Sequence, residues 1–180
     1  RAPPAPPTKE WPVADRPAPG SLQRELRQTR PFRTLGQEAH VALLRTADQA
    51  KYQFAGLFQA QKLTLQQYNV LRILRGAGEK GLPTLEIGER MIERTPGVTR
   101  IVDRLERKGW VNRDRGVEDR RRVWCTITPS GLELLAALDD PVDDLDEAIF
   151  EVLDDHEVQT LVDILATLRA RMSAMEKERG

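Results

Sequence analysis

The hydrophobic pattern of this chain changes its period once, and that change limits the folds available to it. From residue 34 to residue 108 apolar side chains recur every three or four positions, which is the spacing of amphipathic helices. Residues 110–128 instead alternate apolar and polar side chains on either side of a charged turn, as a two-stranded hairpin does. Helical spacing returns from residue 129. The sequence therefore predicts a mainly α fold with a small β-hairpin.

The first two helices are marked by periodicity and by a capping signal. An amphipathic stripe over residues 34–61 predicts one long helix. Thr64 and Gln67 have the spacing of a capping box, in which the cap and the third residue satisfy each other's free backbone N–H groups. The second helix is therefore expected to begin at Thr64 and to end at the glycines of residues 76–81.

A short third helix is predicted next. Thr84 is expected to cap it, because a threonine hydroxyl can accept a bond from a free N–H of the first turn. The helix would run to about Ile92. The residues expected to face the core are Leu85, Gly88 and Met91.

Thr95 and Pro96 predict the start of a fourth helix. A cap followed by proline suits the first helical turn, where the missing proline N–H costs nothing. The helix is expected to span 96–108 and to stop at Gly109. Its core-facing residues would be Val98, Ile101, Val102 and Leu105. The opposite face is polar and mostly cationic.

Cys125 lies in the second strand of the predicted hairpin. That strand spans 122–128, and Cys125 shares its inner face with Val123 and Ile127. The cysteine is therefore expected to be a packed thiol rather than a sensor or a nucleophile.

Two further signals open the C-terminal helices. Thr128 and Pro129 repeat the cap-plus-proline pattern, with a helix end expected at Pro141. Asp154 and Glu157 form another N-terminal box and predict a last helix. The acidic residues beside the proline are interpreted as a solvated face rather than as a metal or acid–base cluster; they are Asp139, Asp140, Asp143 and Asp144.

Residues 1–31 form a proline-rich N-terminal arm with 8 of the 12 prolines. This composition excludes a helix or a sheet interior and favours irregular or polyproline-like structure. A short helix could form from Ser21 to Gln28. The arm is either a dispensable tail or a segment that lies against a partner, with Trp11 as its anchor.

Composition excludes several classes of protein. A single cysteine rules out an internal disulfide, and together with two histidines it leaves little for a metal site, so neither a metal nor a cofactor is expected. No stretch approaches the roughly 20 apolar residues of a membrane span, and no segment has the pattern of a signal peptide. The cytoplasm is the expected compartment.

Charge is distributed unevenly along the chain. The 28 basic and 28 acidic residues cancel, but residues 62–122 carry 15 basic against 9 acidic side chains. Residues 123–168 contain 12 acidic residues and neither lysine nor arginine. Such asymmetry steers a polyanion to one face and repels it elsewhere. Ordinary solvated helix faces would explain the charges alone equally well.

Short helices followed by a cationic hairpin indicate a winged helix-turn-helix. In that fold the second helix of the pair presents its N-terminal end to the DNA major groove. Thr99 and Arg100 lie near the start of the fourth helix, where side chains can meet base edges. The hairpin carries five arginines that can reach a minor groove or the DNA backbone, namely Arg113, Arg115, Arg120, Arg121 and Arg122.

Several motifs in this region resemble the MarR regulator pattern. They are Gly97-Val-Thr-Arg-Ile-Val-Asp-Arg-Leu-Glu106, then Lys108-Gly-Trp-Val111, Asp119-Arg-Arg121 and Ile127-Thr-Pro-Ser-Gly131. The resemblance covers about residues 34–175. Trp110 stands where the family usually has leucine, and Pro96 is a rigid residue at a contact position, so base preference does not transfer.

The resemblance implies a homodimeric, sequence-specific regulator of transcription that binds double-stranded DNA. It implies a winged helix-turn-helix at 62–128 and a helical dimerisation region at 32–61 and 129–180. Asp119 would orient Arg121, and Arg121 would reach the minor groove. The expected DNA contacts are Thr95, Pro96, Gly97, Thr99, Arg100, Arg104, Arg107, Arg113, Arg115, Asp119, Arg120 and Arg121.

The resemblance also implies a ligand-responsive repressor acting on an inverted-repeat operator. A small aromatic or phenolic effector would bind between the dimer helices and the winged domain. The candidate pocket residues are His40, Arg45, Tyr52 and Tyr68. The peroxide-sensing branch of the family has a cysteine near the first helix, and this chain has none there.

Two other classes of function fit the sequence less well. An enzyme would need a nucleophile and a base or a metal, and His40 and His156 lie far apart without a serine or cysteine motif near either. A winged helix used as a protein-interaction module would carry an acidic or apolar exposed face on helix 96–108 and would not explain the arginines of the wing. The sequence favours a DNA-binding regulator that is not an enzyme.

Overall fold

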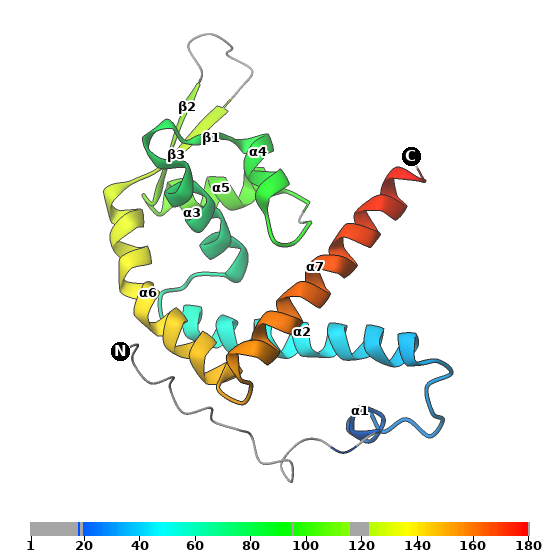
Figure 1. The fold of residues 1–180 in the computed structure, drawn as a ribbon. Helices are drawn as coiled ribbons and strands as arrows, with labels where there is room; N and C mark the ends of the chain where they lie inside the picture. Colours follow the sequence, from blue (N-terminus) through cyan, green and yellow to red (C-terminus); the bar gives the residue numbers. More distant parts are fainter. Residues whose placement is uncertain (1–17, 19, 95, 116–122, 180) are drawn as a thin grey trace, which may run out of the picture. The chain divides into compact units, whose positions relative to one another are not determined.

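Figure 1 shows the computed structural model, which describes residues 18, 20–94, 96–115 and 123–179. The helices are α1 (Ser21–Glu25), α2 (Leu35–Gln59), α3 (Leu65–Ala77), α4 (Thr84–Arg90), α5 (Val98–Arg107), α6 (Pro129–Phe150) and α7 (Asp155–Lys177). A 3₁₀ turn, η2 (Gly78–Lys80), precedes the first strand. The strands are β1 (Leu82–Pro83), β2 (Val111–Arg115) and β3 (Val123–Ile127). The predicted fold class, mainly α with a small β-hairpin wing, is confirmed.

The chain divides into two compact units. One comprises residues 35–144, and the other the described parts of residues 1–34 and 145–180. The winged helix-turn-helix lies entirely in the first unit, which is described first.

The sheet has three strands rather than the predicted two. The strand order is β1-β3-β2, and both pairs are antiparallel. Strand β1 was missed because two residues carry no alternating pattern. It pairs with β3 through Leu82 opposite Cys125 and Pro83 opposite Trp124. Pro83 is tolerated there because β1 lies at the edge of the sheet.

Helix α3 lies at the centre of the core of this unit. Its residues Val70, Leu71 and Leu74 are fully buried. The ring of Tyr68 on α3 stacks on Phe58 of α2, with the ring centroids 4.3 Å apart. The other buried apolar residues are Leu63, Leu82, Ile87, Val102, Leu105, Val111, Cys125, Leu135, Leu138 and Val142. The core therefore joins α2 and α6 to the winged helix-turn-helix.

The capping boxes are confirmed. The Thr64 hydroxyl accepts a bond from the Gln67 N–H at 3.2 Å, and the Gln67 side chain accepts one from the Thr64 N–H at 3.1 Å. Asp154 and Glu157 make the reciprocal pair at 2.8 and 3.2 Å. These bonds begin α3 and α7 where the sequence placed them.

Helix α4 differs from its prediction in two respects. Its N-cap is Pro83, and Thr84 instead contacts β3, with its Oγ1 3.5 Å from the Val123 carbonyl and 3.5 Å from the Cys125 sulfur. Leu85 is 76% exposed, whereas Ile87 is fully buried. The pairing of β1 with β3 fixes the chain directly before this seven-residue helix and so decides which of its faces is buried.

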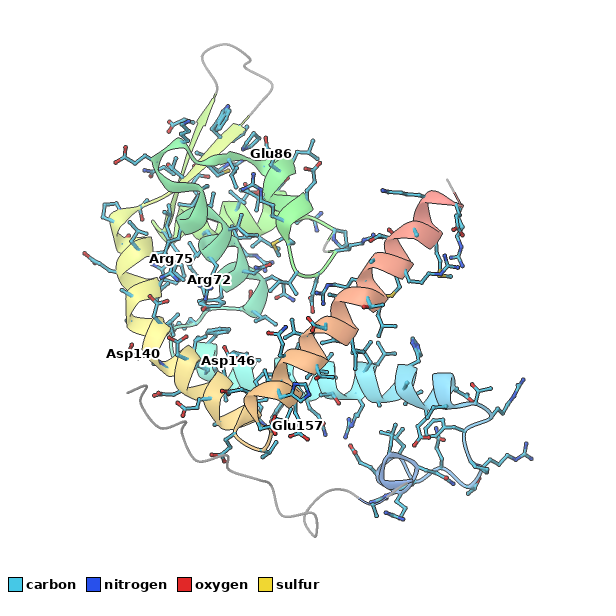
Figure 2. The ribbon with its side chains drawn as sticks, viewed as in Figure 1. Arg72, Arg75, Glu86, Asp140, Asp146 and Glu157 are labelled. Carbon is cyan, nitrogen blue, oxygen red and sulfur yellow. The ribbon has the colours of Figure 1, made fainter. Side chains whose placement is uncertain are left out.

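Helix α6 also departs from the sequence expectation, because it continues through Pro141. Proline removes one helical N–H bond, but Leu138, three residues before it, and Val142, directly after it, are buried and keep the helix in place. Asp139 is not merely solvated. It accepts bonds of 2.8 and 2.9 Å from Arg75 of α3, labelled in Figure 2, and the guanidinium holds the pKa of that carboxyl below its usual range.

The second unit contains the ends of the chain. Helix α1 confirms the short helix expected from Ser21, although it ends at Glu25 rather than Gln28. Trp11 and most of the proline-rich arm lie outside the described residues. Helix α7 buries none of its residues in this chain. Its exposed apolar side chains are Leu161, Val162, Ile164, Leu168 and Met172.

Two glycines beside β1 provide a matched test of this packing. Gly78 and Gly81 have nearly the same left-handed backbone, with φ of 64° and 61°. A Cβ at Gly78 would meet open space, whereas one at Gly81 would lie 2.2 Å from the Cys125 carbonyl oxygen. We predict that Gly78→Ala lowers the free energy of unfolding by about 1–3 kcal/mol through backbone strain. Gly81→Ala should cost about 1–3 kcal/mol more, because the added methyl overpacks against β3.

Urea unfolding of both variants measures this difference. Equal losses for Gly78→Ala and Gly81→Ala would contradict the close approach of Gly81 to β3.

Candidate nucleic-acid interface

The start of α5 differs from the sequence prediction. The helix begins at Val98, and its N-cap is Gly97, which has φ 88° and makes no side-chain cap bond. Pro96 therefore precedes the helix instead of opening its first turn. Thr95, the predicted cap, lies outside the described residues. The chain enters the helix through a glycine with a left-handed backbone, and the cap-plus-proline pattern does not predict such a start.

The end of α5 agrees with the prediction. The Gly109 N–H bonds the Glu106 carbonyl at 2.8 Å, and the Trp110 N–H bonds the Leu105 carbonyl at 3.0 Å. This is a Schellman motif, which needs the left-handed glycine, and Gly109 has φ 75°. Thr128 donates to the Gly109 carbonyl at 2.7 Å, so the helix end is tied to the residue before α6.

The two faces of α5 have opposite character. Val102 and Leu105 are fully buried, and Val98 and Ile101 pack against the same core. Arg100 and Arg104 are exposed, and their side chains make no hydrogen bond or ion pair with another described residue. Arg107 is also exposed, and its Nε donates to the Asp103 carbonyl at 3.3 Å. Pro96, Gly97 and Thr99 are exposed as well.

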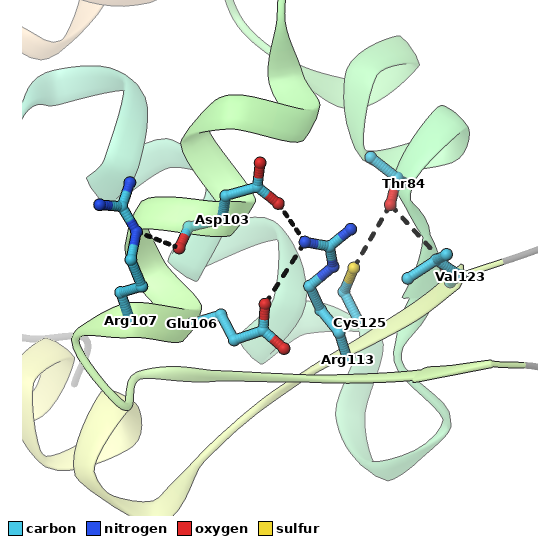
Figure 3. Close-up of polar contacts among 7 residues, drawn as sticks. All are labelled: Thr84, Asp103, Glu106, Arg107, Arg113, Val123 and Cys125. Atoms are coloured by element: carbon cyan, nitrogen blue, oxygen red, sulfur yellow. Dashed lines mark hydrogen bonds and ion pairs between the residues drawn. The ribbon is translucent and has the colours of Figure 1, made fainter.

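Arg113 lies in β2 and contacts α5 (Figure 3). Its Nη1 pairs with the carboxylate of Asp103 and, at 3.3 Å, with that of Glu106. The Arg113 side chain is only 21% exposed. Arg113 is among the residues that the sequence predicts to contact DNA, whereas these ion pairs are not predicted from the sequence. The signal was present, because two carboxylates three residues apart on a helix lie on one face.

Cys125 lies in β3, opposite Arg113 in the ladder. It is fully buried, and burial raises the pKa of its thiol. The prediction of a packed thiol agrees with this environment.

The wing is described only in part. Arg115 is the last residue of β2. Asp119, Arg120, Arg121 and Arg122 lie outside the described residues. The roles expected for these arginines and for Asp119 stay predictions.

A groove of about 700 Å³ lies between α2 and the start of α3. Tyr52 lines it, together with Lys51, Lys62, Gln66 and Glu93 among others. The other candidate effector residues lie elsewhere. His40 and Arg45 are exposed on α2, and Tyr68 is buried with its hydroxyl accepting a 2.9 Å bond from Arg72. The structure thus brings only one of the four candidates to this groove.

The described part of the chain contains no cluster of three or more histidine, cysteine or acidic residues placed to hold a metal ion. Nor does it contain a helix with the length and apolar character that crossing a membrane requires.

Comparison with known proteins gives a consistent picture. The MarR family pattern matches residues 63–123. The HTH-type transcriptional regulator FarR of Neisseria gonorrhoeae is 30% identical over 129 residues, which cover 72% of this chain and 87% of FarR. A MarR transcription factor from Planctomyces limnophilus is 37% identical, with a TM-score of 0.60 over 76% of this chain and 99% of that one. The structure of NadR in complex with 4-hydroxyphenylacetate is 28% identical, with a TM-score of 0.62 over 77% and 97%.

The contact of Arg113 with Asp103 predicts a measurable coupling. In a double-mutant cycle of Arg113→Ala and Asp103→Ala, we expect a coupling of about 0.5–1 kcal/mol in the free energy of unfolding, because both side chains are partly exposed. Urea unfolding of the four proteins measures it.

Asp103 and Arg107 form the control pair, since Arg107 bonds the Asp103 backbone and not its carboxylate. Their cycle should show a smaller coupling, no more than the ~0.2–0.5 kcal/mol of an exposed (i, i+4) pair. Additive effects in the Arg113 cycle would mean that β2 is not tied to α5 in this way.

Proposed function

The chain belongs to the MarR family of transcription regulators, and on that premise we propose that it is a homodimeric repressor of an inverted-repeat operator, released by a small molecule. Proteins of this family regulate transcription and are not enzymes. The observation that carries the proposal is the exposed cationic face of α5, opposite a buried apolar face. A charged surface of this kind is suited to the phosphates and base edges of DNA.

The residues of α5 would contact different parts of the DNA, depending on their position along the helix. Arg100 lies in the first turn, where a guanidinium can contact guanine through two hydrogen bonds. Arg107 lies in the last turn, closer to the DNA backbone, and would neutralise phosphate. Pro96, Gly97, Thr99 and Arg104 complete the exposed face, with Thr95 preceding it.

The wing would add contacts outside the major groove. In this proposal Asp119 orients Arg121, which enters an adjacent minor groove, and Arg115 and Arg120 contact the backbone. Narrow, A·T-rich minor grooves concentrate negative potential and so favour an inserted arginine. Arg113 would act chiefly through α5, because two carboxylates already hold its guanidinium.

The apolar side chains exposed on α2 and α7 support dimerisation. Leu44 of α2 is 58% exposed, and Ile164 of α7 is 54% exposed. Apolar side chains that stay exposed in one subunit and form a continuous surface are typical of an interface between subunits. A two-fold dimer through regions 32–61 and 129–180 would place two α5 helices one DNA turn apart, about 34–36 Å, and would require an inverted repeat.

The groove beside α2 supports response to a ligand. NadR, which is similar over most of this chain, was solved with 4-hydroxyphenylacetate bound. The groove of this chain carries an aromatic side chain, Tyr52, and two lysines, Lys51 and Lys62. A small aromatic or phenolic compound is therefore the proposed effector class.

Dimerisation can be tested without DNA. We predict that sedimentation equilibrium gives a dimer at micromolar concentration, because burying the apolar stripes of α2 and α7 requires a second subunit. Replacing Ile164 and Leu168 with glutamate should shift the protein towards monomer, since both are exposed within this chain. A wild-type protein that stays monomeric at this concentration would contradict the proposal.

Base reading and phosphate contact can be separated on α5. We predict that Arg100→Ala weakens operator binding by about 1–3 kcal/mol per half-site and relaxes preference at one base position. Arg107→Ala removes the same charge and should weaken binding to all sequences alike. Selection from random duplexes, run with each variant, measures both effects. The same motif with the same information content for wild type and Arg100→Ala would overturn the role of Arg100.

A further inference from the structure

Segment 91–97 joins α4 to α5 and therefore sets where the N-terminal end of α5 lies. That end has no side-chain cap, and it follows a glycine in the left-handed conformation. The turn itself gives the helix start little support. Val98 packs against the core, and contacts made by the preceding residues add to the placement of this helix end.

Glu93 makes those contacts. Its Oε1 lies 2.5 Å from the Nζ of Lys51 on α2, and its Oε2 accepts a bond of 3.3 Å from the Gln66 side chain on α3. The Lys51 ammonium holds the pKa of the Glu93 carboxyl below its usual range. One carboxylate thus ties the segment before α5 to two other helices.

A backbone bond beside Glu93 supports the same attachment. The Ile92 N–H donates to the Asn69 side chain on α3 at 2.9 Å. Gln66 and Asn69 are three residues apart and share a face of α3. The first turn of α3 is itself fixed by the Thr64 capping box. Ile92 and Glu93 are therefore anchored to a well-defined helix start.

Lys51 is the part of this arrangement that belongs to α2. It lines the groove of about 700 Å³ together with Glu93 and Gln66. The groove wall and the anchor of α5 are therefore made by the same side chains.

We propose that Lys51 and Glu93 are positioning residues, through which α2 fixes the N-terminal end of α5 for DNA binding. The inference rests on the proposed function, because it assigns DNA binding to α5. An ion pair this exposed contributes only about 0–1 kcal/mol to global stability. Its effect lies instead in the placement of segment 91–97 and of the helix that follows.

A substitution that makes this region more positive distinguishes a positioning role of Glu93 from a purely electrostatic effect on DNA binding. Glu93→Lys removes one negative and adds one positive charge near α5, and this change would strengthen DNA binding if charge alone mattered. If Glu93 positions the helix, Glu93→Lys should weaken operator binding by about tenfold. Lys51→Glu should also weaken binding, and the exchanged pair Lys51→Glu with Glu93→Lys should recover most of it at unchanged net charge.

Glu89→Lys is the matched control. Glu89 is exposed on the preceding helix, and its side chain makes no hydrogen bond or ion pair with a described residue. This variant makes the same charge change without breaking a contact, so it should bind DNA as tightly as wild type or more tightly.

Hydrogen exchange of the DNA-free protein gives an independent readout. The Ile92 amide should exchange faster in Glu93→Lys and Lys51→Glu than in wild type, and should recover in the exchanged pair. Unchanged exchange at Ile92, or Glu93→Lys binding operator as tightly as Glu89→Lys, would overturn the positioning role. A wild-type protein without sequence preference for DNA would refute the proposed function, while the exchange measurement would still decide whether Glu93 anchors the segment.

Discussion

The buried apolar stripe of α5 is the interaction on which the rest of this structure depends. A helix of ten residues is marginal in water on its own and needs tertiary packing to persist. Val102 and Leu105 supply it, since each is fully buried, and burying one such side chain contributes about 1.5–3 kcal/mol. Once this stripe faces inward, the geometry of a helix directs Arg100, Arg104 and Arg107 outward. Burial of this one apolar stripe therefore exposes the arginines that form the candidate DNA-binding face.

The two ends of α5 and its adjoining strand then restrict how the helix can move. A Schellman motif at Gly109 ends the helix and leads directly into β2. Arg113 returns from β2 to the helix and pairs with Asp103 and Glu106. At the other end, Glu93 links the preceding segment to α2 and α3. Ordering a surface before its partner arrives reduces the entropy lost on binding.

Periodicity and capping signals predicted most of this architecture from the sequence. Thr64, Gly109 and Asp154 act through bonds to residues three positions away, so a local pattern is sufficient to recognise them. The family resemblance of α5 and the wing is confirmed by the similarity to known MarR proteins.

The features that local patterns did not predict are contacts between distant segments. Strand β1 exists because Leu82 meets Cys125, 43 positions later, and this pairing turned Leu85 outward. In the sequence Arg113 looks like the other arginines of the wing, but the fold places its side chain beside Asp103. In the sequence Asp139 looks like part of a solvated acidic face, but the fold places Arg75 of α3 beside it. In each case the local residue type was compatible with more than one partner, and tertiary packing selected among them.

The central claim is that two copies of α5 are presented to DNA by a two-fold dimer. Hydroxyl-radical footprinting on a high-affinity fragment, obtained by selection with the wild-type protein, tests it most directly. We expect two symmetric protected regions whose centres lie about one helical turn apart, 10–10.5 base pairs, over an inverted repeat. A single protected region, or protection without a two-fold centre, would contradict it.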